Sequence, residues 1–295
     1  MGSVREGILH PPAPESVETA VQAAVATARR RWTARDLERE IAARESCPRE
    51  VVGTAIRRLV DGGILEYDYT FGQSYLVLSF HRPVAVGERF VILSPGCQDI
   101  APADRVPLCL APGSAFGSGR HPTTRLALQG LEKGWALAWS SAGSGSPPTT
   151  VIDIGTGSGI LAIAAARLGA VAVTAVDTDA CARWEAAANI ALNAATASII
   201  VTGADLENLP GTFDMVIANL RLPTLIELLP WVRSHLQQKG CVVVSGIRED
   251  EWAVLKARYG DAGYHPVWHR CEAGWIGGLF RVAVGGKACS RLVDG

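Results

Sequence analysis

The sequence predicts an α/β protein whose main domain has a doubly wound, mostly parallel sheet, with a smaller winged-helix-like domain in front of it. Two observations predict the main domain: residues 151–177 form a strand, a glycine-rich turn, a helix and a second strand, and strands and helices keep alternating up to a final hairpin. A third observation predicts the smaller domain, because residues 16–80 contain three helical patterns followed by two strand-like runs. We therefore expect a winged-helix-like domain at 1–82, a bridge at 83–148 and a ligand-binding domain at 149–295.

Each element of the first domain has its own signal. The first helix presents an apolar face made of Val17, Ala20, Val21, Ala24 and Val25. Thr33 with Asp36 resembles a capping box at the start of the second helix, and Pro48 suits the first turn of the third, which ends at Gly62-Gly63. Residues 64–69 and 75–80 are expected strands around a turn at 71–73. Three short helices and a hairpin are typical of a winged helix.

The charge pattern of this domain bears on its partner. Its third helix carries Arg49, Arg57 and Arg58, but acidic residues surround them: Glu45, Glu50, Asp61, Glu66 and Asp68. A DNA-binding winged helix normally has a clear basic face. The near-neutral balance therefore favours homodimer formation or substrate recognition over nucleic-acid contact, and a cofactor-sensing DNA-binding regulator is the remaining alternative.

The bridge is predicted to contain one strand, one loop and one helix. Residues 84–93 alternate as a strand does, and residues 111–124 form a glycine-rich loop that enters a helix at about 122–139. Thr123 or Thr124 can accept hydrogen bonds from the exposed amides of that helix's first turn. Residues 140–148, rich in Ser, Gly and Pro, are expected to form a flexible surface linker.

The glycine-rich turn indicates a nucleotide cofactor. Gly155, Gly157 and Gly159 follow an apolar strand, and Asp177 ends the next strand, where a carboxylate can accept hydrogen bonds from ribose hydroxyls. Relative to the dinucleotide fingerprint the third glycine comes one residue early, and Asp153 precedes the first. A carboxylate there disfavours a pyrophosphate and suits a cofactor that carries an ammonium and a sulfonium group. The sequence therefore predicts S-adenosyl-L-methionine as the cofactor rather than NAD.

Composition excludes several classes. The chain has 295 residues, a formal net charge of -1 and seven scattered cysteines without a Cys-x-x-Cys pair, so neither a zinc site nor a disulfide framework is expected. No secretory signal peptide and no membrane-spanning run is apparent. We therefore expect a cytoplasmic protein with reduced thiols, no metal and no membrane contact.

The second half completes the sheet. We expect Asp214 to fix the loop ahead of a fourth strand and Pro230 to interrupt the helix that follows it. The pattern then predicts a fifth strand at 241–244, a helix at 249–259 and two final strands at 264–270 and 275–284. Asn189 and Asn193, four residues apart after the second strand, are interpreted as solvent-facing positions on a helix.

Four segments resemble the PrmA family, bacterial methyltransferases that act on a stalk-base protein of the large ribosomal subunit. They are AFGSGRHPTT at 115–124, VIDIGTGSGILAIAAARLGA, AVDTD and FDMVIANL. The resemblance covers about residues 83–283. It implies the class I methyltransferase fold, a Rossmann-like sheet of seven strands with one antiparallel member, and methylation by S-adenosyl-L-methionine.

The same resemblance assigns the site residue by residue. Phe116, Gly117, His121 and Thr123 would line the methionine end of the cofactor. The glycine motif is Asp153, Gly155, Thr156, Gly157 and Gly159, followed by Asp177 and Thr178 at the ribose and by Asp205 and Leu206 at the adenine edge. Asn219 would orient the acceptor amine through its side-chain carbonyl. His121 is the titrating candidate for proton transfer, with a loop-fixing hydrogen bond as its alternative role.

The acceptor is left open at this point. The family's recognition domain is a small α/β unit, whereas residues 16–80 here predict a winged helix. A protein amine is the first hypothesis, and a small molecule bound in a pocket completed by dimerisation is the alternative. Arg221 lies at the expected acceptor mouth, where it indicates either an acidic acceptor or a solvated residue at a helix start.

Overall fold

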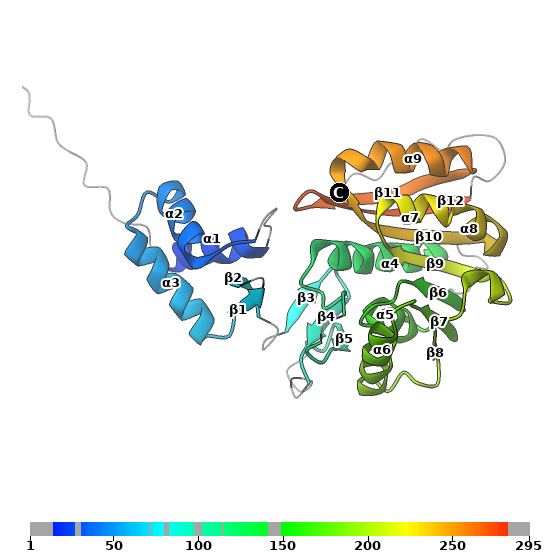
Figure 1. The fold of residues 1–295 in the computed structure, drawn as a ribbon, viewed down its shortest axis with the longest axis horizontal. Coiled ribbons are helices and arrows are strands. Elements are labelled where there is room, and N and C mark those ends of the chain that lie inside the picture. Colours follow the sequence, from blue (N-terminus) through cyan, green and yellow to red (C-terminus); the bar gives the residue numbers. More distant parts are fainter. Residues whose placement is uncertain are drawn as a thin grey trace, which may run out of the picture. The chain divides into compact units, whose positions relative to one another are not determined.

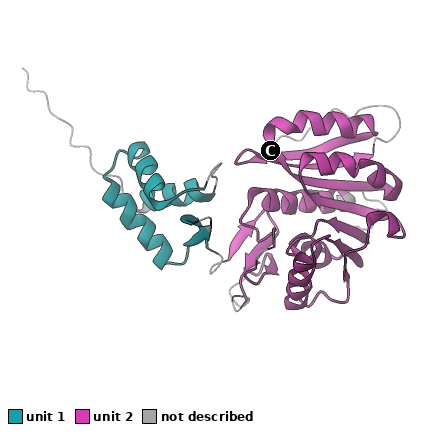
Figure 2. Ribbon diagram, in the orientation of Figure 1, with its two compact units in different colours: residues 1–82 teal, residues 83–295 magenta. Residues whose placement is uncertain are grey.

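The computed structural model describes residues 14–26, 31–70, 72–79, 83–95, 97, 102–113, 115–140 and 149–282. The chain divides into two compact units, residues 1–82 and 83–295 (Figure 2). Several predicted features lie outside the described residues: the amino-terminal segment, Phe71 of the predicted turn, Phe80 of the second strand, the linker at 141–148 and the end of the last strand at 283–284.

The first unit contains three helices and a two-stranded antiparallel hairpin, in the expected order (Figure 1). The elements are α1 (Pro14–Ala26), α2 (Ala34–Arg44), α3 (Arg49–Asp61), β1 (Leu65–Thr70) and β2 (Gln73–Leu78). The Thr33 side chain accepts a hydrogen bond from the Asp36 amide at 3.2 Å, which confirms the predicted N-cap of α2. Val17, Leu37, Ile41 and Ile56 pack in a common core. The recognition or dimerisation role of this unit stays a prediction.

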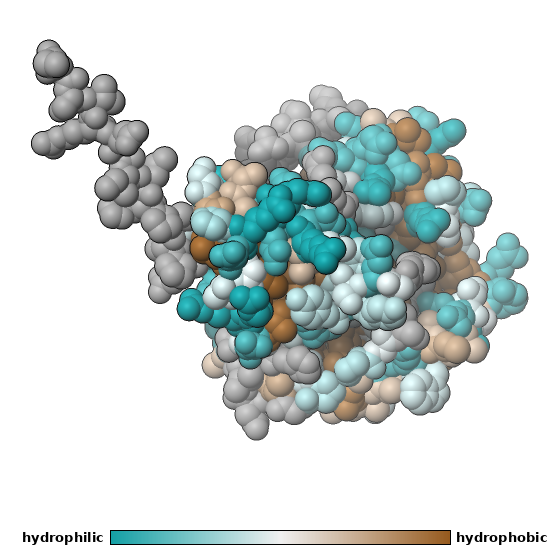
Figure 3. All heavy atoms as spheres, turned by 60° about the vertical axis from the view of Figure 1, so that its left-hand side comes forward, coloured by the Kyte–Doolittle hydropathy of each residue, from teal (hydrophilic) through white to brown (hydrophobic). Residues whose placement is uncertain are grey.

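Ion pairs join opposite charges on the surface of the first unit. Arg58 on α3 forms an ion pair with Glu18 on α1 at 3.6 Å, and Arg31 bonds Asp68 at 3.5 Å while lying over the Tyr75 ring. On the face shown in Figure 3, hydrophilic residues are interspersed with smaller hydrophobic areas. These pairs place a carboxylate beside each of the two arginines.

The second unit begins with a small sheet that corrects the sequence analysis. The single strand predicted at 84–93 is wrong: β3 (Val84–Val86) and β4 (Phe90–Leu93) form an antiparallel hairpin, and β5 (Val106–Cys109), which was not predicted, pairs parallel with β4. The chain reverses at Gly87, whose φ of 59° favours glycine. The buried Glu132 side chain accepts hydrogen bonds from the amides of Glu88 and Arg89, which stabilises this turn.

The main sheet has seven strands in the order β11-β12-β10-β9-β6-β7-β8. Its strands are β6 (Thr150–Ile154), β7 (Ala172–Val176), β8 (Ile199–Thr202), β9 (Phe213–Asn219), β10 (Leu236–Arg248), β11 (Tyr264–Glu272) and β12 (Trp275–Val282). Neighbouring strands from β8 to β10 pair parallel, while β12 pairs antiparallel with both β10 and β11. The predicted seven-stranded sheet with one antiparallel member is confirmed.

Helices cover both faces of this sheet. They are α4 (Pro122–Ser140), α5 (Ile160–Leu168), α6 (Ala180–Leu192), α7 (Leu222–Glu227), α8 (Leu229–His235) and α9 (Trp252–Asp261), with short 3-10 helices η2 (Leu206–Asn208) and η3 (Glu249–Glu251). Gly130 and Gly134 of α4 lie against the side chains of Val243 and Met215, respectively. A new helix, α8, begins at Leu229 with Pro230 in its first turn, so the predicted interruption is confirmed. Within the described residues, no helix is long and apolar enough to cross a membrane.

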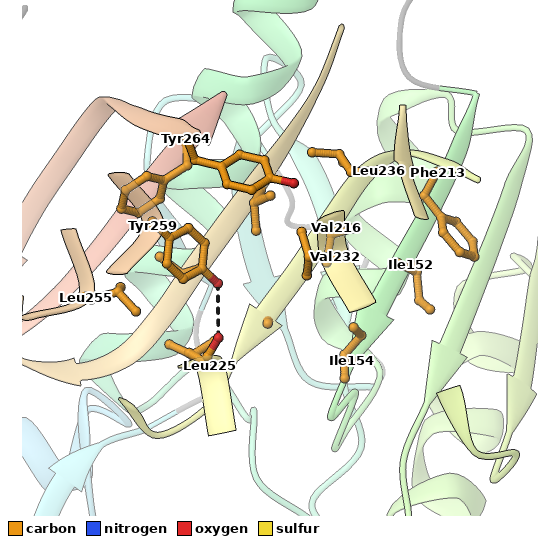
Figure 4. Close-up of a cluster of buried hydrophobic side chains, with 14 of the residues drawn as sticks. Ile152, Ile154, Phe213, Val216, Leu225, Val232, Leu236, Leu255, Tyr259 and Tyr264 are labelled. Atoms are coloured by element: carbon orange, nitrogen blue, oxygen red, sulfur yellow. Dashed lines mark hydrogen bonds between the residues drawn. The ribbon is translucent and has the colours of Figure 1, made fainter. Parts of the chain in front are cut away.

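The face of the sheet opposite α4 packs against α7, α8 and α9. Ile152, Ile154 and Val216 point into this layer together with Leu225 of α7 and Tyr259 of α9 (Figure 4). The Tyr259 hydroxyl donates a hydrogen bond to the Leu225 carbonyl at 3.4 Å, which links α9 to α7. Val216 and its neighbours Met215 and Ile217 are all fully buried, as expected for a strand covered on both faces.

Asn189 and Asn193 do not face solvent, and the interpretation given to them above is wrong. Both are buried: Asn189, on α6, is 3 % exposed, and Asn193, the C-cap of α6, is 2 % exposed. Asn193 accepts a hydrogen bond from the Cys109 amide at 2.9 Å and donates to the Cys109 carbonyl, while Asn189 accepts from the Ala111 amide at 3.0 Å. Among the described residues, β4 is the strand that pairs with β5, so the two amides bond backbone groups of Cys109 and Ala111 in place of a second strand.

Asp214 is also placed differently from the prediction. It lies within β9 and accepts hydrogen bonds from the amides and hydroxyls of Thr149 and Thr150, so it fixes the start of β6 rather than the loop ahead of β9. Burial alone would raise the pKa of Asp214, but these four donors outweigh it and lower the pKa below its ordinary value.

Candidate functional site

A cavity of about 1080 Å³ lies at the sheet edge where the parallel strands end. Most of the predicted site residues line it: Phe116, His121, Thr123, Gly155, Gly157, Asp177, Thr178, Asp205, Leu206 and Asn219. Its volume is at the upper end of the range for small-molecule sites. The edge of an open α/β sheet beyond the carboxyl ends of its strands is where such folds bind ligands.

Strand order sets the sequence of groups along the cavity. Asp205 follows β8, Asp177 follows β7, and Gly155 follows β6 at the centre of the sheet. Asn219 ends β9, and Trp275 begins β12. The cavity therefore runs from two carboxylates at one side of the sheet to an amide and an indole at the other.

The glycine loop lies directly against a neighbouring loop. The Gly155 amide donates to the Val176 carbonyl at 2.8 Å, which holds the end of β6 against β7. Gly157 has a φ of 54°, and a Cβ at this position would collide with the Phe116 carbonyl oxygen. Only glycine allows this backbone approach, so the loop from 115 to 121 can pack onto the glycine loop.

Asp177 is held in place by backbone amides. Its Oδ2 accepts a hydrogen bond from the Gly157 amide at 2.9 Å, and its Oδ1 accepts from the Asp179 amide at 3.0 Å. A carboxylate oxygen has a second acceptor position, so both oxygens can accept a further hydrogen bond from the cavity.

Four predicted site residues do not line the cavity: Gly117, Asp153, Thr156 and Gly159. Asp153 is fully buried, and its Oδ2 accepts from the Thr156 hydroxyl at 2.7 Å and the Ala162 amide at 3.2 Å. At Gly159, a Cβ would lie 3.2 Å from Ala186, so this glycine allows α5 and α6 to approach closely. These residues support the glycine loop without lining the cavity themselves.

The Asp153 carboxyl is an unusual group. Its Oδ1 is buried and has no hydrogen-bond partner among the described residues. Burial raises the pKa of Asp153 to about 7 and outweighs the hydrogen bonds from Thr156 and Ala162, which lower it.

His121 caps helix α4. Its Nδ1 accepts a hydrogen bond from the Thr123 amide at 3.3 Å and lies 2.8 Å from the Thr123 hydroxyl. The prediction that Thr123 or Thr124 accepts hydrogen bonds from the first-turn amides is wrong. Among the described residues, Thr124 Oγ1 is buried without a partner, and His121 Nδ1 accepts the amide hydrogen bond instead. Since Nδ1 accepts, the neutral ring carries its hydrogen on Nε2. This geometry matches the loop-fixing alternative.

An aromatic lip borders one end of the cavity, formed by Phe116, His121 and Trp275. The His121 ring meets the edge of Trp275 at a centroid distance of 4.8 Å and lies 5.3 Å from Phe116. The Arg248 guanidinium lies over the Trp275 ring at 4.3 Å. The sequence analysis did not identify Trp275 as a site residue, because the sequence marks it only as the first residue of a hydrophobic strand.

Asn219 ends β9 with an unused acceptor. Its Oδ1 is buried and has no hydrogen-bond partner among the described residues, although the residue lines the cavity. A buried amide oxygen without a partner costs about 1–3 kcal/mol, a cost that a bound donor group can remove.

Arg221, at the N-terminus of α7, is exposed and also lines the cavity.

The charged residues of the lining are mostly acidic: Asp177, Asp179, Asp205 and Glu207, against Arg221. This balance favours a cationic ligand. Within the described residues, no group of three His, Cys, Asp or Glu side chains is arranged to hold a metal ion.

Comparison with known proteins points to one family. The family model described as ribosomal protein L11 methyltransferase (PrmA) matches residues 76–281. A ribosomal protein L11 methyltransferase from Geotalea uraniireducens is 38 % identical over 198 residues, and one from Pelobacter propionicus is 38 % identical over 206 residues. These alignments cover 66 % and 68 % of this chain and 63 % and 64 % of the two relatives, respectively. The chain thus matches just under two thirds of their length.

A solved structure agrees with this result. The crystal structure of ribosomal protein L11 methylase from Lactobacillus delbrueckii subsp. bulgaricus is 31 % identical, with a TM-score of 0.60. The match covers 69 % of this chain and 100 % of that chain.

Proposed function

Because the chain belongs to the PrmA family of ribosomal protein L11 methyltransferases, we propose that it transfers a methyl group from S-adenosyl-L-methionine to an amine nitrogen of a protein. The observation that carries the proposal is the juxtaposition of Asp177, the glycine loop and Asn219 along one cavity. This order matches a ligand with a nucleoside at one end and a reactive group at the other.

The residues present fit this cofactor. Asp177 lies where a ribose would bind, and the Gly155–Gly157 backbone approaches the cavity without side chains. Asp205 and Leu206 would hold the adenine edge, and the acidic lining suits a ligand that carries a sulfonium and an ammonium. When bound, S-adenosyl-L-methionine supplies a methyl group that a nitrogen lone pair can displace from sulfur.

Asn219 would hold the acceptor nitrogen. It is the last residue of β9, on the side of the glycine loop away from Asp177, so an acceptor beside it would lie next to the reactive end of the cofactor. Its unpaired Oδ1 can accept a hydrogen bond from an amine and so direct the lone pair toward the methyl group. An amide cannot act as a general base, and its contribution is therefore orientation.

The acceptor amine must lose a proton before it can attack. A lysine with a pKa near 10.4 is about 3.4 units from neutrality at pH 7, which corresponds to about 4.6 kcal/mol. The aromatic lip and Leu220 would surround the amine with apolar groups, and desolvation lowers the pKa of an amine. The contacts of His121 Nδ1 with the Thr123 amide and hydroxyl support a positioning role for this residue.

The names of the relatives support ribosomal protein L11 as the acceptor, and they give no support to the small-molecule alternative. Residues before 76 lie outside the family match, so we propose that the first unit contributes recognition specific to this chain. A cytoplasmic location would follow from a ribosomal-protein acceptor.

The test uses the purified chain with radiolabelled S-adenosyl-L-methionine, purified ribosomal protein L11 and, separately, a fractionated bacterial extract. Label in ribosomal protein L11 is the expected result. Label in another protein band would retain the methyltransferase and change its acceptor. Label only in small metabolites would overturn the protein-acceptor proposal, and no transfer together with no donor binding would overturn the enzyme.

A further inference from the structure

We propose that Arg125 is a positioning residue: through Glu272 it holds the 115–121 loop against the β11–β12 turn and thereby sets the opening of the aromatic lip for the acceptor. This inference rests on the proposed function, in which the acceptor amine enters beside Asn219. It assigns a role to an ion pair between two parts of the chain that are 147 residues apart.

The Arg125 guanidinium is buried and fully used. The residue is 8 % exposed, and its Nε and Nη2 donate to Glu272 Oε1, the Nε contact at 2.7 Å. Its Nη1 donates to the carbonyl oxygens of Arg120 at 2.6 Å and Gly119 at 3.3 Å. One side chain therefore binds both a carboxylate on β11 and the backbone of the loop, a geometry that the planar guanidinium supports and an ammonium does not.

The two groups that Arg125 joins carry the aromatic lip. Arg120 directly precedes His121, and Glu272 directly precedes the turn at Ala273–Gly274 that leads to Trp275. Ala273 and Gly274 both have positive φ, 51° and 77°, so the turn is tight and the position of Glu272 is transmitted to Trp275. The His121–Trp275 contact at 4.8 Å is made between the two joined segments.

The loop is attached separately to the cofactor motif. The Ser158 amide donates to the Phe116 carbonyl at 2.8 Å, and the Ser158 hydroxyl donates to the Gly117 carbonyl at 2.9 Å. These bonds do not involve Arg125. Removing the Arg125–Glu272 pair should therefore loosen the acceptor side of the cavity while the donor side keeps its shape.

The experiment compares Glu272→Ala, Glu272→Gln and Glu88→Gln in the full chain. Glu88→Gln is the matched control, because Glu88 pairs with Lys133 of the same helix α4 at 3.2 Å but is 81 % exposed in its side chain and far from the lip in sequence. Three quantities are measured: the donor Kd by calorimetry, kcat and KM for the acceptor protein, and amide hydrogen exchange of segments 116–121 and 272–276.

For Glu272→Ala we expect the acceptor KM to rise about tenfold or more, the donor Kd to change less than about twofold, and exchange to increase in both segments. Glu272→Gln, which keeps an acceptor for Arg125, should recover most of the KM, and Glu88→Gln should behave as the unmodified chain. If Glu272→Ala does not fold, Glu272→Gln is compared with Glu88→Gln instead. A rise in acceptor KM and in exchange is then expected for Glu272→Gln, smaller than the rise expected for Glu272→Ala.

Two results would overturn the positioning role: exchange and acceptor KM unchanged in the Glu272 variants, or donor Kd and acceptor KM raised equally. The exchange and calorimetry measurements need no turnover. If the unmodified chain binds the donor and transfers no methyl group, the proposed acceptor fails while the exchange data still decide whether the pair holds the lip.

Discussion

The Asp177 carboxylate accepts a hydrogen bond from the Gly157 amide at 2.9 Å, which joins the end of β7 to the glycine loop after β6. The acid proposed to bind the ribose is thus also part of the support for the loop beneath the cofactor. One substitution at this residue tests both relationships.

Asp177→Ala should weaken donor binding by about 1–3 kcal/mol, because it removes the ribose acceptor and leaves the Gly157 amide without its partner. Calorimetry with S-adenosyl-L-methionine and with its demethylated product measures the change. Asp177→Asn is the matched variant and should lose less, since it keeps an acceptor oxygen. Unchanged affinity in Asp177→Ala would remove this residue from the site.

Asn219→Ala should lower kcat/KM for the acceptor by about 10- to 100-fold, because the amide oxygen that orients the nitrogen is lost. Donor affinity should change much less. Steady-state methyl transfer gives the first quantity and calorimetry the second. A loss confined to donor affinity would place Asn219 at the cofactor and not at the acceptor.

Asp153 should make the stability of the protein depend on pH. Its folded pKa of about 7 exceeds the ordinary value of 3.8, so between these values the folded state holds a proton that the unfolded state has released. The free energy of unfolding should therefore fall as pH rises from about 4 to 7. Urea unfolding across this range measures the slope, and Asp153→Asn should flatten it. An identical slope in the variant would contradict the assignment.

Asn193→Ala should lower the free energy of unfolding by about 1–3 kcal/mol for each buried backbone group left unpaired, here the amide and carbonyl of Cys109. Leu192→Ala serves as the control on the same helix, because Leu192 is 43 % exposed. Chemical denaturation compares the two variants. Equal losses would mean that the buried amide contributes no more than the exposed leucine.

A fragment of residues 83–295 should fold and bind the donor like the full chain, because this unit contains the sheet, both helix layers and the whole cavity. A cooperative thermal transition and calorimetry test this. Acceptor methylation should fall if the first unit recognises the acceptor. Full activity of the fragment toward ribosomal protein L11 would assign the first unit another role.

Much of the fold followed from local patterns. The apolar strands, the glycines after β6 and the interruption at Pro230 each express a preference of a few adjacent residues, and each was predicted correctly. The predicted strand at 84–93 failed because the turn at Gly87 depends on Glu132, which is distant in the sequence. A local pattern does not contain such a partner.

The site residues also fall into two groups, those that local sequence patterns predict and those that depend on distant partners. Asp177 and Asn219 could be placed because they end predicted strands, whose carboxyl ends share one edge. The burial of Asn189 and Asn193 could not be predicted, because it depends on hydrogen bonds to the backbone of Cys109 and Ala111, and helix periodicity gives no sign of that neighbour. Trp275 and Arg125 were missed for the same reason: their partners come from the other end of the unit.

The reversed direction of β12 brings the start of that strand to the cavity. Because β12 runs against its neighbours, its first residue reaches the edge at which β6, β7 and β9 end. The short connection before it can thus change length or sequence at the entrance proposed for the acceptor, while the part of the cavity proposed to bind the nucleoside, built from other strands, stays the same. Substitutions in this final hairpin could then reshape the proposed acceptor entrance without a new fold.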